Sequence, residues 1–349
     1  MRIAIVNDMK MAVEALRRTV ESFEGYEVAW VAENGLEAVQ RCALDVPDLI
    51  LMDIIMPEMD GVEATRQIMA KSPCAILVVT SSITQHVSLV FQAMGAGALD
   101  AVCTPTLGMH DETTGREEFL QKIRTIGRLI NVSRRTAVVK QKKIVKKEKS
   151  DNWLIAIGAS TGGPAAVAKV ISQFPKDIQA AVIVIQHVDQ NFAPGLAEWL
   201  SKQTSVPVRL AQEGDTIENG QILIAGKNDH LHIKDDQTLG YKDAPRSTPY
   251  RPSVDVFFES ILTNWKGKSM AALLTGMGRD GAQGLLALRE NGMFTIAQNA
   301  ETCAVYGMPK VAAALSAAVK VLPIEEVAQA LLNSLPKGRV GAAKYEKQY

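Results

Sequence analysis

The residues best suited to covalent chemistry lie around Ser160. Trp153–Ile157 is an apolar run that leads into a glycine-rich stretch with this serine near its middle. Such a run predicts a buried parallel strand, and the glycines allow a sharp turn into a helix that Pro164 can begin. Gly158, Ser160 and Gly162 match the spacing of a nucleophile elbow, which lifts a serine above the edge of a sheet. A phosphate-binding loop has the same composition, so other residues must distinguish a nucleophile elbow from a phosphate-binding loop.

Two later strand ends supply partners for this serine. One predicted strand ends in His187, and another leads into a glycine-bracketed loop that holds Asp280. Acyl transfer needs a nucleophile, a base and a group that orients the base, which are the roles we assign to Ser160, His187 and Asp280. The backbone N–H of Met277, between two glycines, is placed to stabilise an oxyanion. These residues predict a serine hydrolase.

A dinucleotide-binding module is the competing interpretation of the same turn. Its G-x-G-x-x-G fingerprint needs a glycine where this chain has Ser160, and an acid at the end of the next strand to hold a ribose. That strand ends in His187 instead, which favours the hydrolase. The chain order of serine, histidine and aspartate differs from that of the α/β-hydrolases, so the elbow does not indicate that fold.

The elements that must position these groups form two series of alternating strands and helices. Alternation of this kind predicts α/β domains with parallel sheets and right-handed crossovers. The expected strands of the first series are Ile3–Val6, Val28–Val31, Leu49–Met52, Ala75–Val79 and Leu99–Cys103. Those of the second are Trp153–Ile157, Ala181–Ile185, Ile222–Ala225, Met270–Leu274 and Thr295–Ala297, which predict a doubly wound, Rossmann-like parallel sheet.

Asp8, Asp53 and Thr80 follow or end strands of the first series. Two carboxylates at one sheet edge repel each other unless a hard cation such as Mg²⁺ neutralises them. A carboxylate beside such a cation can accept a phosphoryl group. Asp53 is followed by the sequence Ile-Ile-Met-Pro-Glu-Met-Asp-Gly. On the basis of this motif and the three strand-end residues, residues 1 to about 130 resemble a response-regulator receiver of flavodoxin-like fold. The resemblance implies that Asp53 is the phospho-acceptor, that Asp8 and Asp53 bind Mg²⁺, and that Thr80 senses the phosphate.

Three positions depart from the receiver pattern. Asn7 stands where a second acidic metal ligand is usual, Thr104 where the family has lysine, and Ala101 where it has an aromatic residue. With threonine in place of lysine at position 104, the site lacks the lysine ammonium group and its charge-assisted contact to the phosphate, worth roughly 1.5–3 kcal/mol. We expect phosphorylation of Asp53. The alternative is a pseudo-receiver that only packs against its neighbour.

The motifs of the second series resemble the chemotaxis protein-glutamate methylesterases of the CheB type. The match rests on the stretches Gly158–Pro164, Gln186-His187, Arg251–Asp255 and Leu274–Gly281, and it extends over nearly the whole chain. Val6-Asn-Asp-Met9 and Thr104-Pro105 are most similar to the WspF-like branch.

This resemblance implies a reaction and its partners. The substrate is a methyl-accepting receptor whose cytoplasmic helices carry glutamate γ-methyl esters, and the product is methanol; deamidation of receptor glutamines can accompany it. Catalysis needs no cofactor, Thr161 supports the site, and a CheA-type histidine kinase is the phosphodonor. The receiver covers the entrance of the active site until phosphorylation loosens it.

Charge and composition suggest the boundaries of the domains. We expect a receiver over residues 1–132, a basic linker over 133–150, the catalytic domain over 151–336 and a frayed tail over 337–349.

The linker could bind nucleic acid or an anionic membrane, but it lacks aromatic stacking residues, so we expect a solvated segment and no nucleic-acid partner. No apolar run reaches the roughly 18 residues of a membrane span, which predicts no membrane insertion. The four cysteines are scattered, as in a reduced cytoplasmic protein.

Two further groups of residues leave alternatives open. His230 and His232 alternate as in a strand and could face one metal, but no suitable third ligand joins them, so we favour a structural role. Arg251 and Asp255 either shape the site or form an ion pair with each other.

Overall fold

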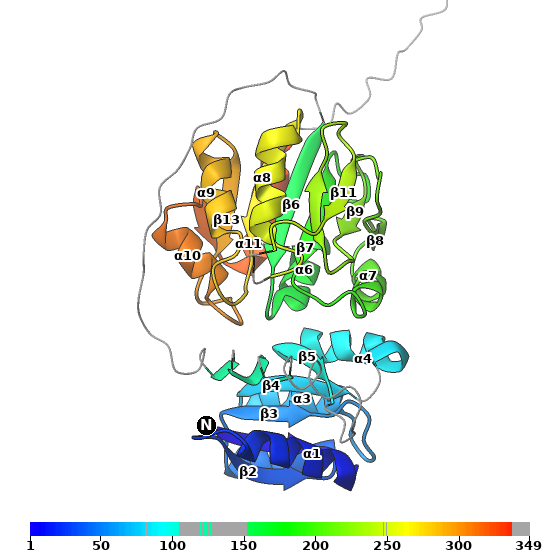
Figure 1. Cartoon of the computed structure of the whole chain (residues 1–349), viewed down its shortest axis with the longest axis vertical. Coiled ribbons are helices and arrows are strands. Elements are labelled where there is room, and N and C mark those ends of the chain that lie inside the picture. The colour runs from blue at the N-terminus through cyan, green and yellow to red at the C-terminus, as the bar shows by residue number, and fades with distance from the viewer. Residues whose placement is uncertain are drawn as a thin grey trace, which may run out of the picture.

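The computed structural model consists of two α/β domains stacked one on the other (Figure 1). It describes residues 1–80, 83–104, 119–127 other than 121 and 125, and 152–336 other than 247 and 249. The expected basic linker and C-terminal tail therefore lie outside the described residues, and so does Pro105.

The N-terminal domain is built on a five-stranded parallel sheet of order β2-β1-β3-β4-β5, which is the flavodoxin-like order. Its strands are β1 (Arg2–Val6), β2 (Glu27–Ala32), β3 (Leu49–Met52), β4 (Ala75–Thr80) and β5 (Asp100–Cys103). Its helices are α1 (Lys10–Glu21), α2 (Gly35–Leu44), α3 (Gly61–Lys71) and α4 (Ile83–Gly95). The prediction of this fold is confirmed.

The C-terminal domain is built on a seven-stranded sheet of order β14-β13-β12-β6-β7-β9-β8, and all its strand pairs are parallel. The strands are β6 (Trp153–Ala159), β7 (Ala181–Gln186), β8 (Val208–Leu210), β9 (Ile222–Ile224), β12 (Lys268–Leu273), β13 (Phe294–Gln298) and β14 (Lys320–Leu322). An antiparallel hairpin of β10 (His230–Ile233) and β11 (Leu239–Lys242) stands apart. The doubly wound sheet is confirmed, although β8 and β14 at its edges were not predicted.

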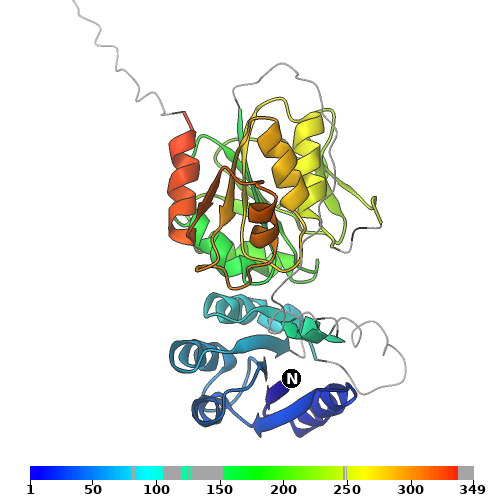
Figure 2. The same ribbon diagram turned by 90° about the vertical axis from the view of Figure 1, so that its left-hand side faces the viewer.

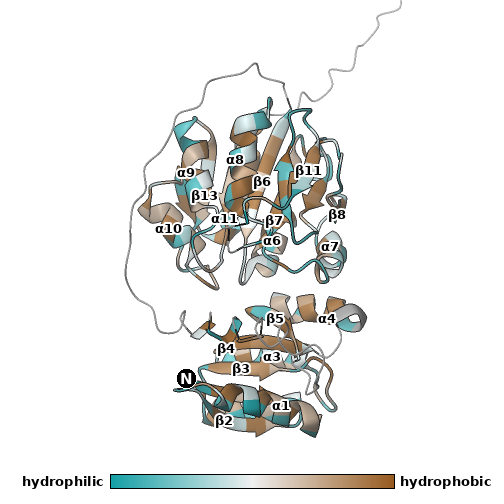
Figure 3. Cartoon of the chain, in the orientation of Figure 1, coloured by the Kyte–Doolittle hydropathy of each residue, from teal (hydrophilic) through white to brown (hydrophobic). Residues whose placement is uncertain are grey.

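Helices cover both faces of this sheet (Figure 2). One face packs against α6 (Gly163–Ile171), α7 (Ala193–Ser201) and α11 (Ile324–Ser334). The other packs against α8 (Val254–Asn264), α9 (Ala282–Glu290), α10 (Met308–Ala314) and the hairpin. Buried apolar side chains fill most of the central strands, as expected where both faces of a sheet are covered (Figure 3).

The two domains meet through α4 of the first and α7 of the second. The Phe91 ring stacks on Trp199 with centroids 6.2 Å apart, and Val87 packs against Gly195. The carbonyl of Leu99 accepts a hydrogen bond of 3.1 Å from the N–H of Gly162. The N-terminal domain therefore contacts the very turn that holds Ser160.

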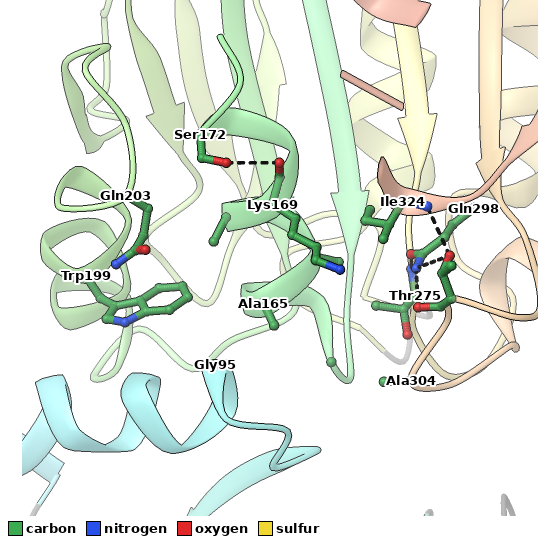
Figure 4. A pocket seen from close by; sticks show the side chains of 14 residues that line it. Gly95, Ala165, Lys169, Ser172, Trp199, Gln203, Thr275, Gln298, Ala304 and Ile324 are labelled. Atoms are coloured by element: carbon green, nitrogen blue, oxygen red, sulfur yellow. Dashed lines mark hydrogen bonds between the residues drawn. The ribbon is translucent and has the colours of Figure 1, made fainter. Parts of the chain in front are cut away.

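A cavity of about 400 Å³ remains beside this contact (Figure 4). Gly95 lines it from α4, Ala165 from α6 and Trp199 from α7, while Thr275 and Ala304 line it from loops near Ser160. The C-terminal domain supplies all of these lining residues except Gly95, so the cavity lies mainly on its side of the contact.

No helix among the described residues is long and apolar enough to span a bilayer.

Candidate functional site

Ser160 lies at the point where the strand order of the C-terminal sheet reverses. It follows β6, whose neighbours β7 and β12 lie on opposite sides, and such a switch point is where ligands bind in open α/β sheets. The turn is sharp: Gly163 donates to the Ser160 carbonyl at 2.7 Å, and Gly162 takes a φ of 73° that favours glycine. The Ser160 N–H donates to the Thr275 carbonyl at 3.0 Å, which ties the turn to the end of β12.

His187 lies beside this turn, directly after β7. Its N–H donates to the Ala159 carbonyl at 3.0 Å, and the Gln186 amide donates to the Ser160 carbonyl at 2.8 Å, so the two strand ends are locked together. The imidazole Nε2 donates to Asp280 Oδ2 at 2.8 Å. Nδ1 is buried and has no hydrogen-bond partner in the described part of the chain. It is therefore the nitrogen left to accept a proton.

Asp280 is 4% exposed and lies against the N-terminus of α8. Besides the bond from His187, its carboxylate accepts hydrogen bonds from Ser253 Oγ at 2.8 Å, from the Val254 N–H at 2.6 Å and from the Asp255 N–H at 3.1 Å. Burial alone raises the pKa of the Asp280 carboxyl, but these donors and His187 outweigh it and hold the pKa below its usual range. The group is a buried carboxylate that can hold one imidazole tautomer.

The loop after β12 approaches the serine closely. A Cβ at Gly276 would lie 2.7 Å from the Ser160 Cβ, so only glycine allows this approach. The half-buried Met277 donates its N–H to no acceptor among the described residues. Thr161 is 8% exposed, and its carbonyl accepts a 3.0 Å hydrogen bond from Thr275 Oγ1.

The structure thus places Ser160, His187, Asp280, Met277 and Thr161 around one sheet edge. The Ser160 hydroxyl makes no hydrogen bond to His187 or to any other described residue. Hydrogen bonds between nucleophile and base are often completed only in the complex with substrate.

Sequence reasoning missed two residues that support this arrangement. Tyr250 stacks on the His187 ring, and Ser253 caps α8 while bonding Asp280. His230, which is 0% exposed, accepts the Ser253 N–H at Nδ1 over 3.1 Å and faces the Pro245 carbonyl with Nε2 at 3.3 Å. Both of its nitrogens are committed, and burial lowers its pKa, which supports the structural role. A serine directly before the apolar helix is the one signal that could have found Ser253.

Arg251 and Asp255 do not pair with each other. Arg251 instead forms an ion pair with Asp243, and Asp255 accepts the Gly284 N–H at 2.7 Å. The ion-pair alternative for these two residues was therefore wrong. Burial and the nearby charge of Asp280 raise the pKa of Asp255 to about 7.

Replacing Asp255 with asparagine should flatten the pH dependence of stability. The folded pKa of about 7 lies above the unfolded value near 3.9, so the native state holds a proton that the unfolded chain releases. Stability should therefore fall as the pH rises from about 4 to about 7, by an amount of the order of 4 kcal/mol. Urea unfolding at pH 5 and pH 8 measures this loss, which should be smaller in Asp255→Asn. An equal loss in both proteins would contradict the assignment.

The N-terminal domain has its own acidic site at the switch point between β1 and β3. Asp53 is half-buried and follows β3, while the exposed Asp8 follows β1. Burial raises the pKa of Asp53 to about 6, and the charge of Asp8 adds to the shift. A bound cation would relieve the repulsion between the two carboxylates, so they fit a Mg²⁺ ion.

Asn7 takes an unexpected orientation in this site. It is 3% exposed, and its amide nitrogen donates to Asp53 Oδ2 at 2.9 Å while its oxygen accepts the Met9 N–H at 2.8 Å. The amide thus stabilises the Asp53 carboxylate, and its oxygen is turned away from it. Thr80 is buried at the end of β4, and its carbonyl accepts the Thr104 N–H at 2.9 Å.

Fold and site together define a class of protein: an α/β domain with a buried serine at its switch point, preceded by a receiver-like domain. Residues 155–331 match the family model described as CheB methylesterase, and residues 3–106 match that of the response regulator receiver domain. The chain belongs to the CheB methylesterase family.

Three relatives illustrate the extent of the similarity. Protein-glutamate methylesterase/protein-glutamine glutaminase 3 of Pseudomonas aeruginosa is 53% identical over 331 residues, which cover 95% of this chain and 98% of the relative. The enzyme of the group 3 operon of Pseudomonas putida is 51% identical over 97% of this chain and 100% of its own. The crystal structure of the Thermotoga maritima CheB methylesterase catalytic domain matches with a TM-score of 0.50 at 32% identity, covering 53% of this chain and 98% of that one.

Proposed function

We propose that this chain is a receiver-regulated protein-glutamate methylesterase that acts on methyl-accepting chemotaxis-type receptors. The observation that carries the proposal is the buried pair of His187 and Asp280, 2.8 Å apart, next to the turn of Ser160. The relatives named protein-glutamate methylesterase match it over nearly their whole length.

In the first half of the reaction, Ser160 Oγ attacks the carbonyl carbon of a glutamate γ-methyl ester. His187 accepts the hydroxyl proton at Nδ1, because its Nε2–H is bonded to Asp280. The carbonyl oxygen becomes an oxyanion, which the N–H of Met277 stabilises; one such donor typically contributes about 2.7–4 kcal/mol. Collapse of the intermediate expels methoxide, which takes the proton from His187 and leaves as methanol.

In the second half, water attacks the acyl group on Ser160. His187 removes the proton from this water and returns it to the serine oxygen, which releases glutamate. A receptor glutamine can react along the same path with ammonia as the leaving group. None of these steps needs a cofactor, and Thr161 supports the turn on which they take place.

Regulation lies in the N-terminal domain. We propose that Asp53 accepts a phosphoryl group from a CheA-type histidine kinase. A Mg²⁺ ion held by Asp8 and Asp53 would offset the charge on the transferring oxygens. Thr80 senses the phosphate. In the unphosphorylated chain the receiver lies against the Ser160 turn through Leu99 and α4, so its release would open the site to a receptor helix.

We also propose a location for the protein in the cell and bounds for its domains. A cytoplasmic location follows from a substrate on the cytoplasmic helices of a receptor. The proposed domains are residues 1–132 and 151–336, and the proposed linker and tail, 133–150 and 337–349, lie outside the described residues. Asn7 and Thr104 support membership of the WspF-like branch.

The experiment that tests the function measures methanol released from a receptor carrying radiolabelled methyl esters. The full chain should release methanol, and a small phosphodonor such as acetyl phosphate should increase the rate. A fluorophosphonate probe should label the chain, with the adduct mapped to Ser160 by mass spectrometry. A chain that releases no methanol under either condition would refute the proposal.

Replacing Gly195 with alanine should activate the unphosphorylated enzyme. A Cβ at this position would overlap the Val87 side chain of the receiver, and overpacking of this kind costs about 1–3 kcal/mol. The cost falls on the contact between the domains, since alanine inside α7 favours the helix itself. Because 1.4 kcal/mol is a factor of ten, methanol release without phosphodonor should rise roughly tenfold.

Gly95→Ala is the matched control, because its Cβ would lie 3.1 Å from Trp199 and would demand only a small shift. It should raise the basal rate less than Gly195→Ala does. If Gly195→Ala leaves the basal rate unchanged, the docked receiver does not restrain the active site.

A further inference from the structure

Tyr250 lies directly over the imidazole of His187. The two rings are stacked, with centroids 4.5 Å apart and planes inclined by 6°. His187 is bonded through its ring only at Nε2, since Nδ1 has no hydrogen-bond partner in the described part of the chain. A ring bonded at one atom can pivot about that bond, and a flat side chain against its face restricts the movement.

Tyr250 is itself held in place at both ends. Its hydroxyl oxygen lies against Gly278, where a Cβ would overlap it. On the chain it precedes Arg251, which pairs with Asp243, and Ser253, which caps α8 and bonds Asp280. The segment from Tyr250 to Ser253 therefore acts on His187 in two ways. Tyr250 covers the face of the imidazole, and Ser253 stabilises the carboxylate of Asp280, which bonds the imidazole at Nε2.

We propose that Tyr250 is a positioning residue that holds the His187 ring in the plane where Nδ1 can take the proton of Ser160. The proposal rests on the methylesterase activity proposed above. The aromatic ring is the part that matters: a flat face keeps the imidazole from turning, and the hydroxyl only rests on the loop of Gly278.

Two substitutions in the full-length chain separate the ring from the hydroxyl. Tyr250→Phe keeps the ring and should retain kcat within about threefold. Tyr250→Leu removes the flat face, and a misplaced catalytic group can cost about a hundredfold, so kcat for methanol release should fall roughly 10- to 100-fold. KM for the methylated receptor should stay within about twofold in both variants, because the proposed role of Tyr250 is exerted through His187 and not through the receptor.

Labelling of Ser160 by a fluorophosphonate gives a readout that does not depend on receptor binding. Tyr250→Leu should slow labelling about as much as it lowers kcat, whereas Tyr250→Phe should label at close to the wild-type rate. Urea unfolding checks the fold, and Tyr250→Met replaces the leucine variant if that one is unfolded.

Three outcomes would overturn the proposal: loss in Tyr250→Phe equal to that in Tyr250→Leu, no loss in the leucine variant, or a higher KM at unchanged kcat. A wild-type chain that labels at Ser160 but releases no methanol would refute the proposed function alone, since the labelling rates would still decide the role of Tyr250.

Discussion

Replacing Ser160 with alanine should reduce methanol release by at least about a hundred-thousandfold. The variant keeps His187, Asp280 and the N–H of Met277, but no atom remains to form the acyl bond. In a serine hydrolase, loss of the nucleophile alone costs about as much as loss of the entire catalytic set, near a millionfold in kcat. The measurement is single-turnover methanol release at high enzyme concentration, compared with the spontaneous hydrolysis of the ester.

The substitution should leave the fold intact, because the hydroxyl of Ser160 makes no hydrogen bond to any described residue. Ser160 makes hydrogen bonds to the described residues only through its backbone: its N–H donates to Thr275, and its carbonyl accepts from Gly163 and Gln186. Thr161→Ala is the matched comparison, since it removes a neighbouring hydroxyl from the same turn; because Thr161 only supports the site, it should cost far less activity than Ser160→Ala. Turnover by Ser160→Ala at near the wild-type rate would exclude a serine mechanism.

The sequence predicts the site well where strand ends determine it. In a parallel sheet the carboxyl ends of the strands lie at one edge, so the residues after three apolar runs had to converge. Ser160, His187 and Asp280 are such residues, and the structure indeed brings them together. The same reasoning brought Asp8 and Asp53 to one edge of the first sheet.

The orientation of side chains at that edge could not be predicted in the same way. Tyr250 reaches His187 from an irregular segment whose path no periodic pattern describes. Asn7 stands where a second acidic metal ligand is usual, but it turns its amide nitrogen toward Asp53 because the Met9 N–H takes its oxygen. Such choices depend on competing hydrogen bonds that form only in the folded chain.

The contact between the domains also has no signature in the sequence. It depends on Val87 packing against Gly195 and on Trp199 lying over Gly95. A small residue opposite a large one is ordinary in any helix, and only the docked structure shows which pairs face each other. How the receiver covers the site therefore had to come from the structure.

Replacing Asp280 with asparagine should lower kcat by roughly ten-thousandfold, as the equivalent change does in serine proteases. The carboxylate accepts two hydrogen bonds at each oxygen: His187 and the Val254 N–H at Oδ2, Ser253 and the Asp255 N–H at Oδ1. An asparagine amide must point its NH₂ group at one of these pairs. If it faces His187, the imidazole has to present a lone pair at Nε2 and a proton at Nδ1, and it can no longer accept the proton of Ser160.

If the amide is reversed, its NH₂ group faces Ser253 and the Asp255 N–H. One buried donor then loses its acceptor, which costs about 1–3 kcal/mol. The variant should therefore lose stability as well as activity. The folded pKa of Asp280 is lowered, so the Asp280 carboxylate stabilises the wild type above about pH 4 and stabilises it less as the pH falls.

Asp255→Asn is the matched control: it makes the same chemical change at the neighbouring carboxyl group and should keep kcat within a few-fold. If Asp280→Asn retained a similar rate, Asp280 would not be the residue that selects the imidazole tautomer, and a neutral acceptor would suffice.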